Sequence, residues 1–153
     1  MAQSARLSEG VAAPRMFAPQ PRNDRDANAR NLDWDLARVT KANLLLVGAE
    51  QTVSSLVFAM WSLFDGPILV RRRHERLALP LASNEIGTLI LHGVETLTHE
   101  EQGVLYEWLT DRASRTRVVS TAPASLLPLV QANLFSSELY YRLNTIWVDM
   151  TGR

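Results

Sequence analysis

The sequence Asn43-Leu44-Leu45-Leu46-Val47-Gly48-Ala49-Glu50-Gln51-Thr52-Val53-Ser54-Ser55 decides the fold class. It begins with a run of apolar residues that ends at a glycine, which is typical of a strand buried on both faces. From Thr52 to Phe64 the apolar residues recur at helical spacing, which predicts one broad buried face. The residues of that face are Val53, Leu56, Val57, Met60, Trp61 and Phe64. A buried strand followed by an amphipathic helix is the repeating unit of α/β proteins.

The same alternation continues on both sides of this stretch. The pattern predicts four further strands, at residues 68–70, 87–91, 117–121 and 145–149. It predicts four further helices, at residues 33–41, 98–113, 126–132 and 136–143. We therefore expect an α/β fold, a three-layer sandwich around a mainly parallel five-stranded sheet.

The predicted helices carry clear start signals and apolar faces. Thr98 and Glu101 have the spacing of a capping box, Ser136 is a good N-cap, and Pro128 suits a first turn. The faces expected to be buried are Leu32, Leu36 and Val39 in the first helix and Val104, Leu105, Trp108 and Leu109 in the helix at 98–113.

The composition excludes several classes of site. Of the 153 residues, 46% are hydrophobic and the formal net charge is zero, so there is no general electrostatic attraction to nucleic acids or anionic membranes. The chain has no cysteine, which excludes disulfides and cysteine-bound zinc. The three histidines, His74, His92 and His99, lack metal-ligand spacing, and no apolar run approaches the ~18 residues that span a bilayer. We expect no metal site and no membrane segment.

Residues 1–31 differ from the rest. They contain Pro14, Pro19, Pro21 and five arginines but few large apolar side chains. Such a stretch cannot bury enough surface to offset the entropy lost on ordering. We therefore predict a disordered leader at 1–31, either a flexible tail or a partner-binding arm, followed by a single folded domain at 32–153.

Two segments resemble a known family. The run Phe135-Ser136-Ser137-Glu138-Leu139-Tyr140-Tyr141-Arg142-Leu143-Asn144 is similar to the motif Phe-Arg-x-Asp-Leu-Tyr-Tyr-Arg-Leu-Asn of sigma-54-dependent transcription activators. The run Gly87-Thr88-Leu89-Ile90-Leu91 resembles the start of that family's Gly-Thr-Leu-Phe-Leu-Asp-Glu strand. This resemblance implies an AAA+-like core with the P-loop NTPase fold, in a bacterial cytoplasm. The family's helical lid and its DNA-binding helix-turn-helix have no counterpart here, so we expect no direct DNA binding.

The phosphate loop that the resemblance implies is degenerate. A working loop reads Gly-x-x-x-x-Gly-Lys-Ser/Thr, in which glycine N–H groups wrap the phosphates, the lysine neutralises them and the hydroxyl holds magnesium. Here Gly48 is kept, but Val53 and Ser54 stand where glycine and lysine belong, and Glu50 adds a negative charge. The remaining candidate ligands are Gly48, Thr52, Ser54 and Ser55, and the alternative is an ordinary strand-to-helix turn.

The catalytic acids are also missing. His92 and Gly93 stand where the family has Asp-Glu, the residues that hold magnesium and orient the attacking water. His92 is interpreted as a polar residue at a strand end and Glu95 as a solvated loop carboxylate. Thr121 is kept, but Ala122 and Ser136 replace the sensor residue and the first arginine of the terminal motif. Arg142 is expected to pair with Glu138 four residues earlier.

The loop by which the family touches the sigma factor, similar to Gly-Ala-Phe-Thr-Gly-Ala, has no counterpart. In its place stands Arg71-Arg72-Arg73-His74-Glu75-Arg76, interpreted as a solvated loop or as a patch that contacts an acidic partner or phosphate. Tyr140, Tyr141 and Arg142 are further candidates for protein contacts. Trp61 and Trp108 fall on predicted core stripes, which favours packing over binding.

These observations predict no catalysis and no required cofactor. The favoured hypothesis is a non-catalytic, ATPase-like regulator or adaptor that contacts an intact sigma-54 activator or a two-component signalling protein. The alternative is a sigma-54-type regulator that binds ATP or ADP with magnesium weakly. A third possibility is a different enzyme that uses His92, Glu95 and Thr121 near the strand ends, where α/β proteins bind ligands.

Overall fold

The computed structural model describes residues 35–37, 39–80, 85–112 and 116–152. The predicted leader at 1–31 lies outside them. The strands are β1 (Leu44–Val47), β2 (Ile68–Arg71), β3 (Thr88–Leu91), β4 (Arg117–Ala122) and β5 (Ile146–Asp149). The helices are α2 (Glu50–Ala59), α3 (His99–Arg112), α4 (Leu127–Gln131) and α5 (Ser137–Leu143), with short 3₁₀ turns at Trp61–Leu63 and Val94–Thr96.

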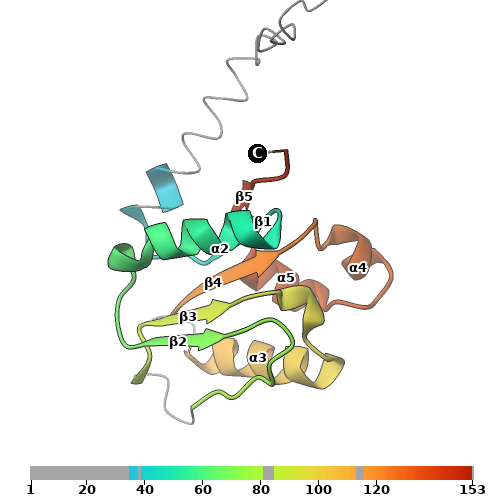
Figure 1. Cartoon of the computed structure of the whole chain (residues 1–153). Helices are drawn as coiled ribbons and strands as arrows, with labels where there is room; N and C mark the ends of the chain where they lie inside the picture. Colours follow the sequence, from blue (N-terminus) through green and yellow to red (C-terminus); the bar gives the residue numbers. More distant parts are fainter. Residues whose placement is uncertain (1–34, 38, 81–84, 113–115, 153) are drawn as a thin grey trace, which may run out of the picture. The chain divides into compact units, whose positions relative to one another are not determined.

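All five strands belong to one parallel sheet, in the order β2-β3-β4-β1-β5. Helix α2 covers one face, and α3, α4 and α5 lie on the other (Figure 1). Every residue of β1, β3 and β4 is buried, as expected for central strands of a parallel sheet. The predicted three-layer α/β fold is therefore confirmed.

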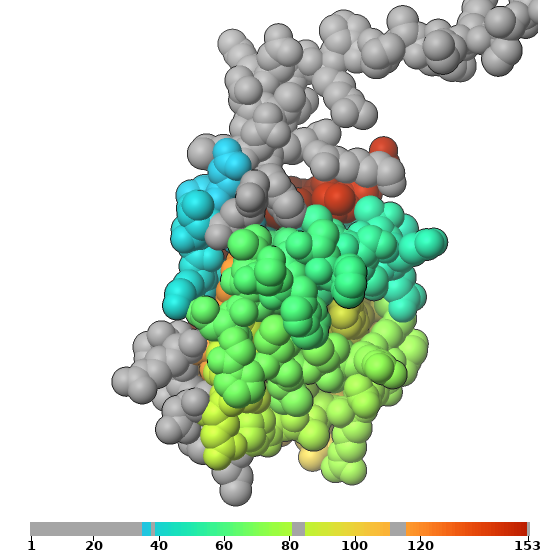
Figure 2. All heavy atoms as spheres, turned by 60° about the vertical axis from the view of Figure 1, so that its left-hand side comes forward, coloured from blue at the N-terminus to red at the C-terminus, as the bar shows by residue number. Residues whose placement is uncertain are grey.

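The side chains of β1 alternate between two cores. Leu44 and Leu46 pack in the layer under α2, whereas Leu45 and Val47 pack with residues of α3 and α5. Figure 2 shows the side on which α2 lies, with residues 35–37 and 39 in blue beside it. The predicted start signals are confirmed: Glu101 N–H donates to Thr98 Oγ1 over 3.1 Å, and Leu139 N–H donates to Ser136 Oγ over 3.2 Å.

Three predicted apolar faces are partly wrong. In the segment 33–41, where the sequence predicts the first helix, Ala37 is buried, whereas Leu36 and Val39 are 39% and 78% exposed. Helix α2 ends at Ala59, and the 3₁₀ turn after it has fewer residues per turn than an α-helix. The side chain of Trp61 is therefore exposed, although Phe64 remains buried.

In α3 the buried face is rotated relative to the prediction. Leu105 and Leu109 are buried as expected, but Val104 is 49% exposed. Gln102 is buried instead, because its amide donates to Leu97 O and Leu134 O and accepts from Ser136 N–H. A polar side chain with all these partners fixes α3 against the segment between α4 and α5. None of the described helices is long and apolar enough to cross a membrane.

Candidate functional site

The carboxyl ends of β1, β3 and β4 meet at one edge of the sheet. Gly48 N–H, just after β1, donates to Ala122 O at the end of β4 over 3.0 Å. Gly93 N–H, just after β3, donates to Thr121 Oγ1 over 3.1 Å. Ligands of open α/β sheets bind at this edge. The structure thus brings together Gly48, His92 and Thr121, the positions that the sequence singled out.

The connection from β1 to α2 is a two-residue turn. β1 ends at Val47 and α2 begins at Glu50, so only Gly48 and Ala49 lie between them. Three of the predicted phosphate ligands, Thr52, Ser54 and Ser55, therefore lie within α2 rather than in a loop. A phosphate loop needs several non-helical residues whose N–H groups face the anion.

Val53 is part of that helix and of the core. Its N–H donates to Ala49 O over 3.0 Å, and its side chain is 1% exposed. In the family pattern this position is the second loop glycine. The valine instead extends the apolar face of α2 one turn closer to β1, which favours an early helix start.

The space at this edge is almost completely filled. A cavity of about 10 Å³ remains there, room for about one water molecule. Its lining residues come from all the strand ends that surround it: Gly48, Glu50, Val53, Arg73, His92, Gly93, Thr121, Ala122 and Pro123. A nucleotide phosphate group does not fit without a rearrangement of these residues.

His92 is half-buried at the end of β3. Burial lowers the pKa of its imidazole, and the nearby negative charge of Glu50 opposes this effect only in part. The neutral imidazole is therefore favoured at neutral pH. No group of three or more potential metal ligands exists among the described residues.

The arginine run does not form one exposed cluster. Arg71 ends β2 and is 4% exposed, so its interpretation as part of a solvated loop is wrong. Its guanidinium donates to Glu75 O, His92 O, Gly93 O and Thr96 Oγ1, over 2.7–3.1 Å. Arg72 and Arg76 are exposed. Of the three predicted contact residues Arg71, Arg72 and Arg73, only Arg72 is exposed.

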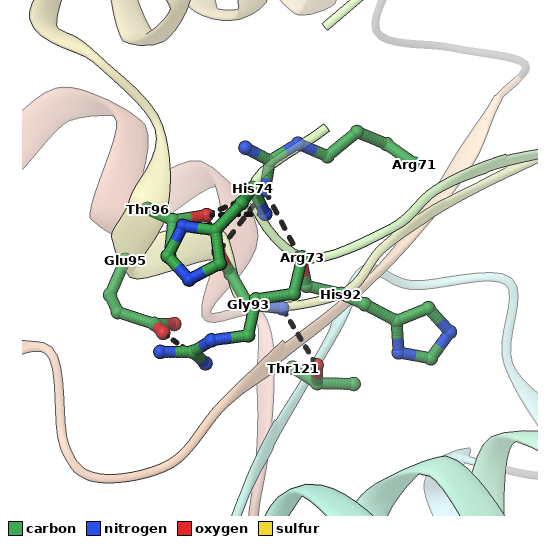
Figure 3. A network of polar contacts seen from close by, with 8 residues as sticks. All are labelled: Arg71, Arg73, His74, His92, Gly93, Glu95, Thr96 and Thr121. Atoms are coloured by element: carbon green, nitrogen blue, oxygen red, sulfur yellow. Dashed lines mark hydrogen bonds and ion pairs between the residues drawn. The ribbon is translucent and has the colours of Figure 1, made fainter. Parts of the chain in front are cut away.

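Arg73 and Glu95 form an ion pair beside this network (Figure 3). The side chain of Glu95 is 14% exposed and both its carboxylate oxygens are shielded from solvent, so the expectation of a solvated loop carboxylate is wrong. The sequence pattern did not predict this pair. The signal that could have revealed it is Gly93. The family has a glutamate at this position, and a glycine there leaves room that another side chain can fill.

The predicted protein-contact residues Tyr140, Tyr141 and Arg142 belong to α5, which lies on the face of the sheet opposite α2. Tyr141 is 72% exposed and stacks edge-on against Tyr140, whose hydroxyl accepts from Asn144 Nδ2 over 3.0 Å. Arg142 lies over the ring of Tyr106. The predicted pair between Arg142 and Glu138 is not formed, because the Glu138 carboxylate accepts from the hydroxyls of Ser136 and Ser137 instead.

Several solved structures share this fold. NtrX from Brucella abortus superposes with a TM-score of 0.63 at 16% identity over 80% of this chain, and its complex with ATP with 0.62 at 17% over 80%. The chain spans only 36% and 34% of those two structures. A structure described as the P-loop NTPase domain of the sigma-54 transport activator from E. coli gives 0.55 at 20% identity, over 84% of this chain and 95% of that one.

These likenesses show the shared fold. No curated protein sequence matches the chain. The family model described as "Sigma-54 interaction domain" matches residues 33–152, which include the whole sheet and every helix from α2 to α5. The chain therefore belongs to the sigma-54 interaction domain family.

Proposed function

We propose that this chain is a non-catalytic, ATPase-like regulatory or adaptor protein that acts in transcription or signalling through protein contacts. The observation that carries the proposal is the two-residue turn between β1 and α2, beside a cavity of about 10 Å³. ATP hydrolysis requires a loop that wraps the phosphates, a cation beside them and a coordinated magnesium ion. The turn supplies no such loop.

The side chains at this edge support the same proposal. Ser54 carries no charge to replace the lysine, and it lies inside α2. His92 and Gly93 provide no carboxylate for magnesium or for the attacking water. Glu95 is the nearest acid along the chain, and Arg73 neutralises it. Each part of the ATPase mechanism therefore lacks its residue.

The test is a calorimetric titration of the full chain with Mg-ATP and Mg-ADP up to millimolar concentration. An active activator domain with an intact phosphate loop serves as the positive control. The proposal predicts no binding heat and no shift in the melting temperature of this chain. Micromolar binding, or release of phosphate above the rate of a denatured sample, would contradict it.

Family membership favours one alternative, a sigma-54-type regulator that binds nucleotide with weak or no hydrolysis. NtrX, which shares the fold, has been crystallised with ATP. In that case the main-chain groups of residues 48–55 would contact the phosphates, and α2 would have to unwind at its first turn. The same titration, followed by hydrogen exchange of residues 48–55 with and without nucleotide, decides between the two.

We propose that the partner is an intact sigma-54 activator or a two-component signalling protein in the cytoplasm. Tyrosine and arginine are frequent anchors of protein interfaces, and α5 presents Tyr141 beside Arg142. A purified activator domain should bind the wild-type chain, and Tyr141→Ala should weaken binding about tenfold or more. Phe58→Ala, at an 80% exposed position of α2, is the matched control and should bind like the wild type.

A further inference from the structure

The side chain of Arg73 lies across the end of β3. A Cβ atom built on Gly93 would lie 2.7 Å from Arg73 Cγ and 3.2 Å from Arg73 Nη1. Gly93 also has a φ angle of 64°, a left-handed conformation that glycine adopts without steric cost. Arg73 therefore fills the room that any side chain at position 93 would need (Figure 3).

Beyond Gly93 the guanidinium of Arg73 reaches the carboxylate of Glu95. Both oxygens of that carboxylate are shielded from solvent, and the ion pair joins Arg73 Nη1 to Oε1. A shielded carboxylate is costly unless a positive charge compensates it. Arg73 provides this compensation by direct contact, and Arg71 adds a favourable charge from the neighbouring strand.

Side-chain hydrogen bonds in the same region connect three strand ends, beside the backbone bond from His92 N–H to Arg71 O. Arg71 joins the end of β2 to the carbonyl groups of His92 and Gly93, and Thr121 joins the end of β4 to Gly93 N–H. Thr96 accepts from Arg71 and donates to Gly93 O over 2.6 Å, which fixes the 3₁₀ turn that carries Glu95. In α/β proteins with a bound ligand, the ligand occupies this edge.

We propose that the side chain of Arg73 permanently occupies the space at the carboxyl edge of the sheet in which a ligand would bind. Paired with Glu95, it takes the place of a bound ligand and holds the end of β3 and the Val94–Thr96 turn in one conformation. The domain then presents a fixed surface to its partner rather than one that changes with a ligand. This inference goes beyond the proposed loss of catalysis, and it does not depend on which partner binds.

The test measures amide hydrogen exchange in variants of the full chain. Arg73→Met keeps most of the side-chain stem but removes the charge, whereas Arg73→Ala removes both. Arg72→Met changes the adjacent, exposed arginine and is the matched control. The reporters are the amides of His92, Gly93, Thr96 and Leu97, each of which donates a hydrogen bond in this region. The amides of β1 report on global unfolding.

The proposal predicts that Arg73→Met raises exchange at the reporter amides by about tenfold or more relative to β1, since it removes the direct ion-pair partner of Glu95. Arg72→Met should leave exchange unchanged. Adding Glu95→Gln to Arg73→Met should restore most of the protection, because the neutral amide needs no cation. A purely steric role for Arg73 would show no such rescue.

Equal exchange in Arg73→Met and Arg72→Met would overturn the proposal, as would the absence of rescue by Glu95→Gln. If Arg73→Met does not fold, Arg73→Lys keeps the charge and most of the stem and should preserve protection at the reporter amides. Exposed reporters in a folded Arg73→Lys variant that retains β1 protection would also contradict the proposal. No ligand enters this experiment, so its outcome is independent of the nucleotide titration.

Discussion

Gly48 and Met150 are in direct contact at the carboxyl edge of the sheet. A Cβ atom built on Gly48 would lie 2.8 Å from Met150 Cβ and 3.2 Å from the Met150 carbonyl carbon. Met150 N–H donates to Val47 O over 2.6 Å, so the backbone after β5 is held against the end of β1. The glycine that resembles the first residue of a phosphate loop therefore has a packing role in this chain.

Gly48→Ala should destabilise the fold, because its methyl group forces the backbone at Met150 away from β1. We expect a loss of about 1–3 kcal/mol in the free energy of unfolding, measured by urea denaturation. Gly103→Ala is the control: Gly103 lies in α3, and no atom lies within 4 Å of the place that an alanine methyl group would take. Alanine there should stabilise the helix by about 0.5–1 kcal/mol. A neutral Gly48→Ala would mean that the contact with Met150 relaxes freely.

Arg71→Met should be more damaging than Arg72→Met. Arg71 is buried and its guanidinium satisfies the carbonyl groups of Glu75, His92 and Gly93. Methionine removes the guanidinium donor of all three carbonyl groups, of which Gly93 O keeps its bonds from Thr96, at a cost of at least about 2 kcal/mol. The exposed Arg72→Met should stay within about 0.5 kcal/mol of the wild type in the same denaturation experiment. Similar stabilities for the two variants would show that Arg71 contributes no net stabilisation.

Stability should fall when the pH decreases below about 6.5, the ordinary pKa of histidine. Burial lowers the pKa of His92 in the folded state, with Glu50 opposing it. The unfolded chain therefore binds a proton more readily, and stability is lost from about pH 6.5 down to the folded pKa. His92→Gln should flatten this part of the pH profile of the melting temperature.

Glu101→Ala should destabilise the domain by about 1–2 kcal/mol. One carboxylate oxygen accepts from Thr98 N–H over 3.0 Å and the other from Leu77 N–H over 2.7 Å, so Glu101 fixes both the start of α3 and the segment after β2. Glu100→Ala changes the exposed neighbour in the same helical turn and should cost about 0.5 kcal/mol or less. Thermal or urea unfolding of both variants measures the difference.

The carboxylate of Glu101 should also make the stability of the domain depend on pH in the acidic range. Burial acts to raise the pKa of Glu101, but the hydrogen bonds from Thr98 and Leu77 and the charge of Arg71 outweigh it and lower the pKa below its ordinary value. The stabilisation is therefore complete above about pH 4.3, the ordinary pKa of glutamate, and is lost as the pH falls through the lower, folded value. Glu101→Gln should remove this dependence, while a profile identical to the wild type would contradict the assignment.

Much of the fold could be predicted because its signals are local. The apolar run at Leu44–Val47, the capping box of Thr98 and Glu101 and the N-cap Ser136 each lie within a few residues, and each is confirmed. The predictions failed where a 3₁₀ turn follows a helix and where a polar side chain finds partners in the core. Trp61 is exposed because a 3₁₀ turn follows α2, and Val104 is exposed because Gln102 finds polar partners in the core.

The sequence by itself determined which residues stand directly after β1 and β3 at the carboxyl edge of the sheet. Ser54 stands where the family has a lysine, and His92 and Gly93 stand where it has two acids. Only the tertiary structure decided how the remaining space is used. Two contacts join residues from different strand ends. Gly48 touches Met150, and the side chain of Arg73 lies over Gly93 and pairs with Glu95. Local propensity cannot specify such contacts, because the order of parallel strands in the sheet brings these residues together.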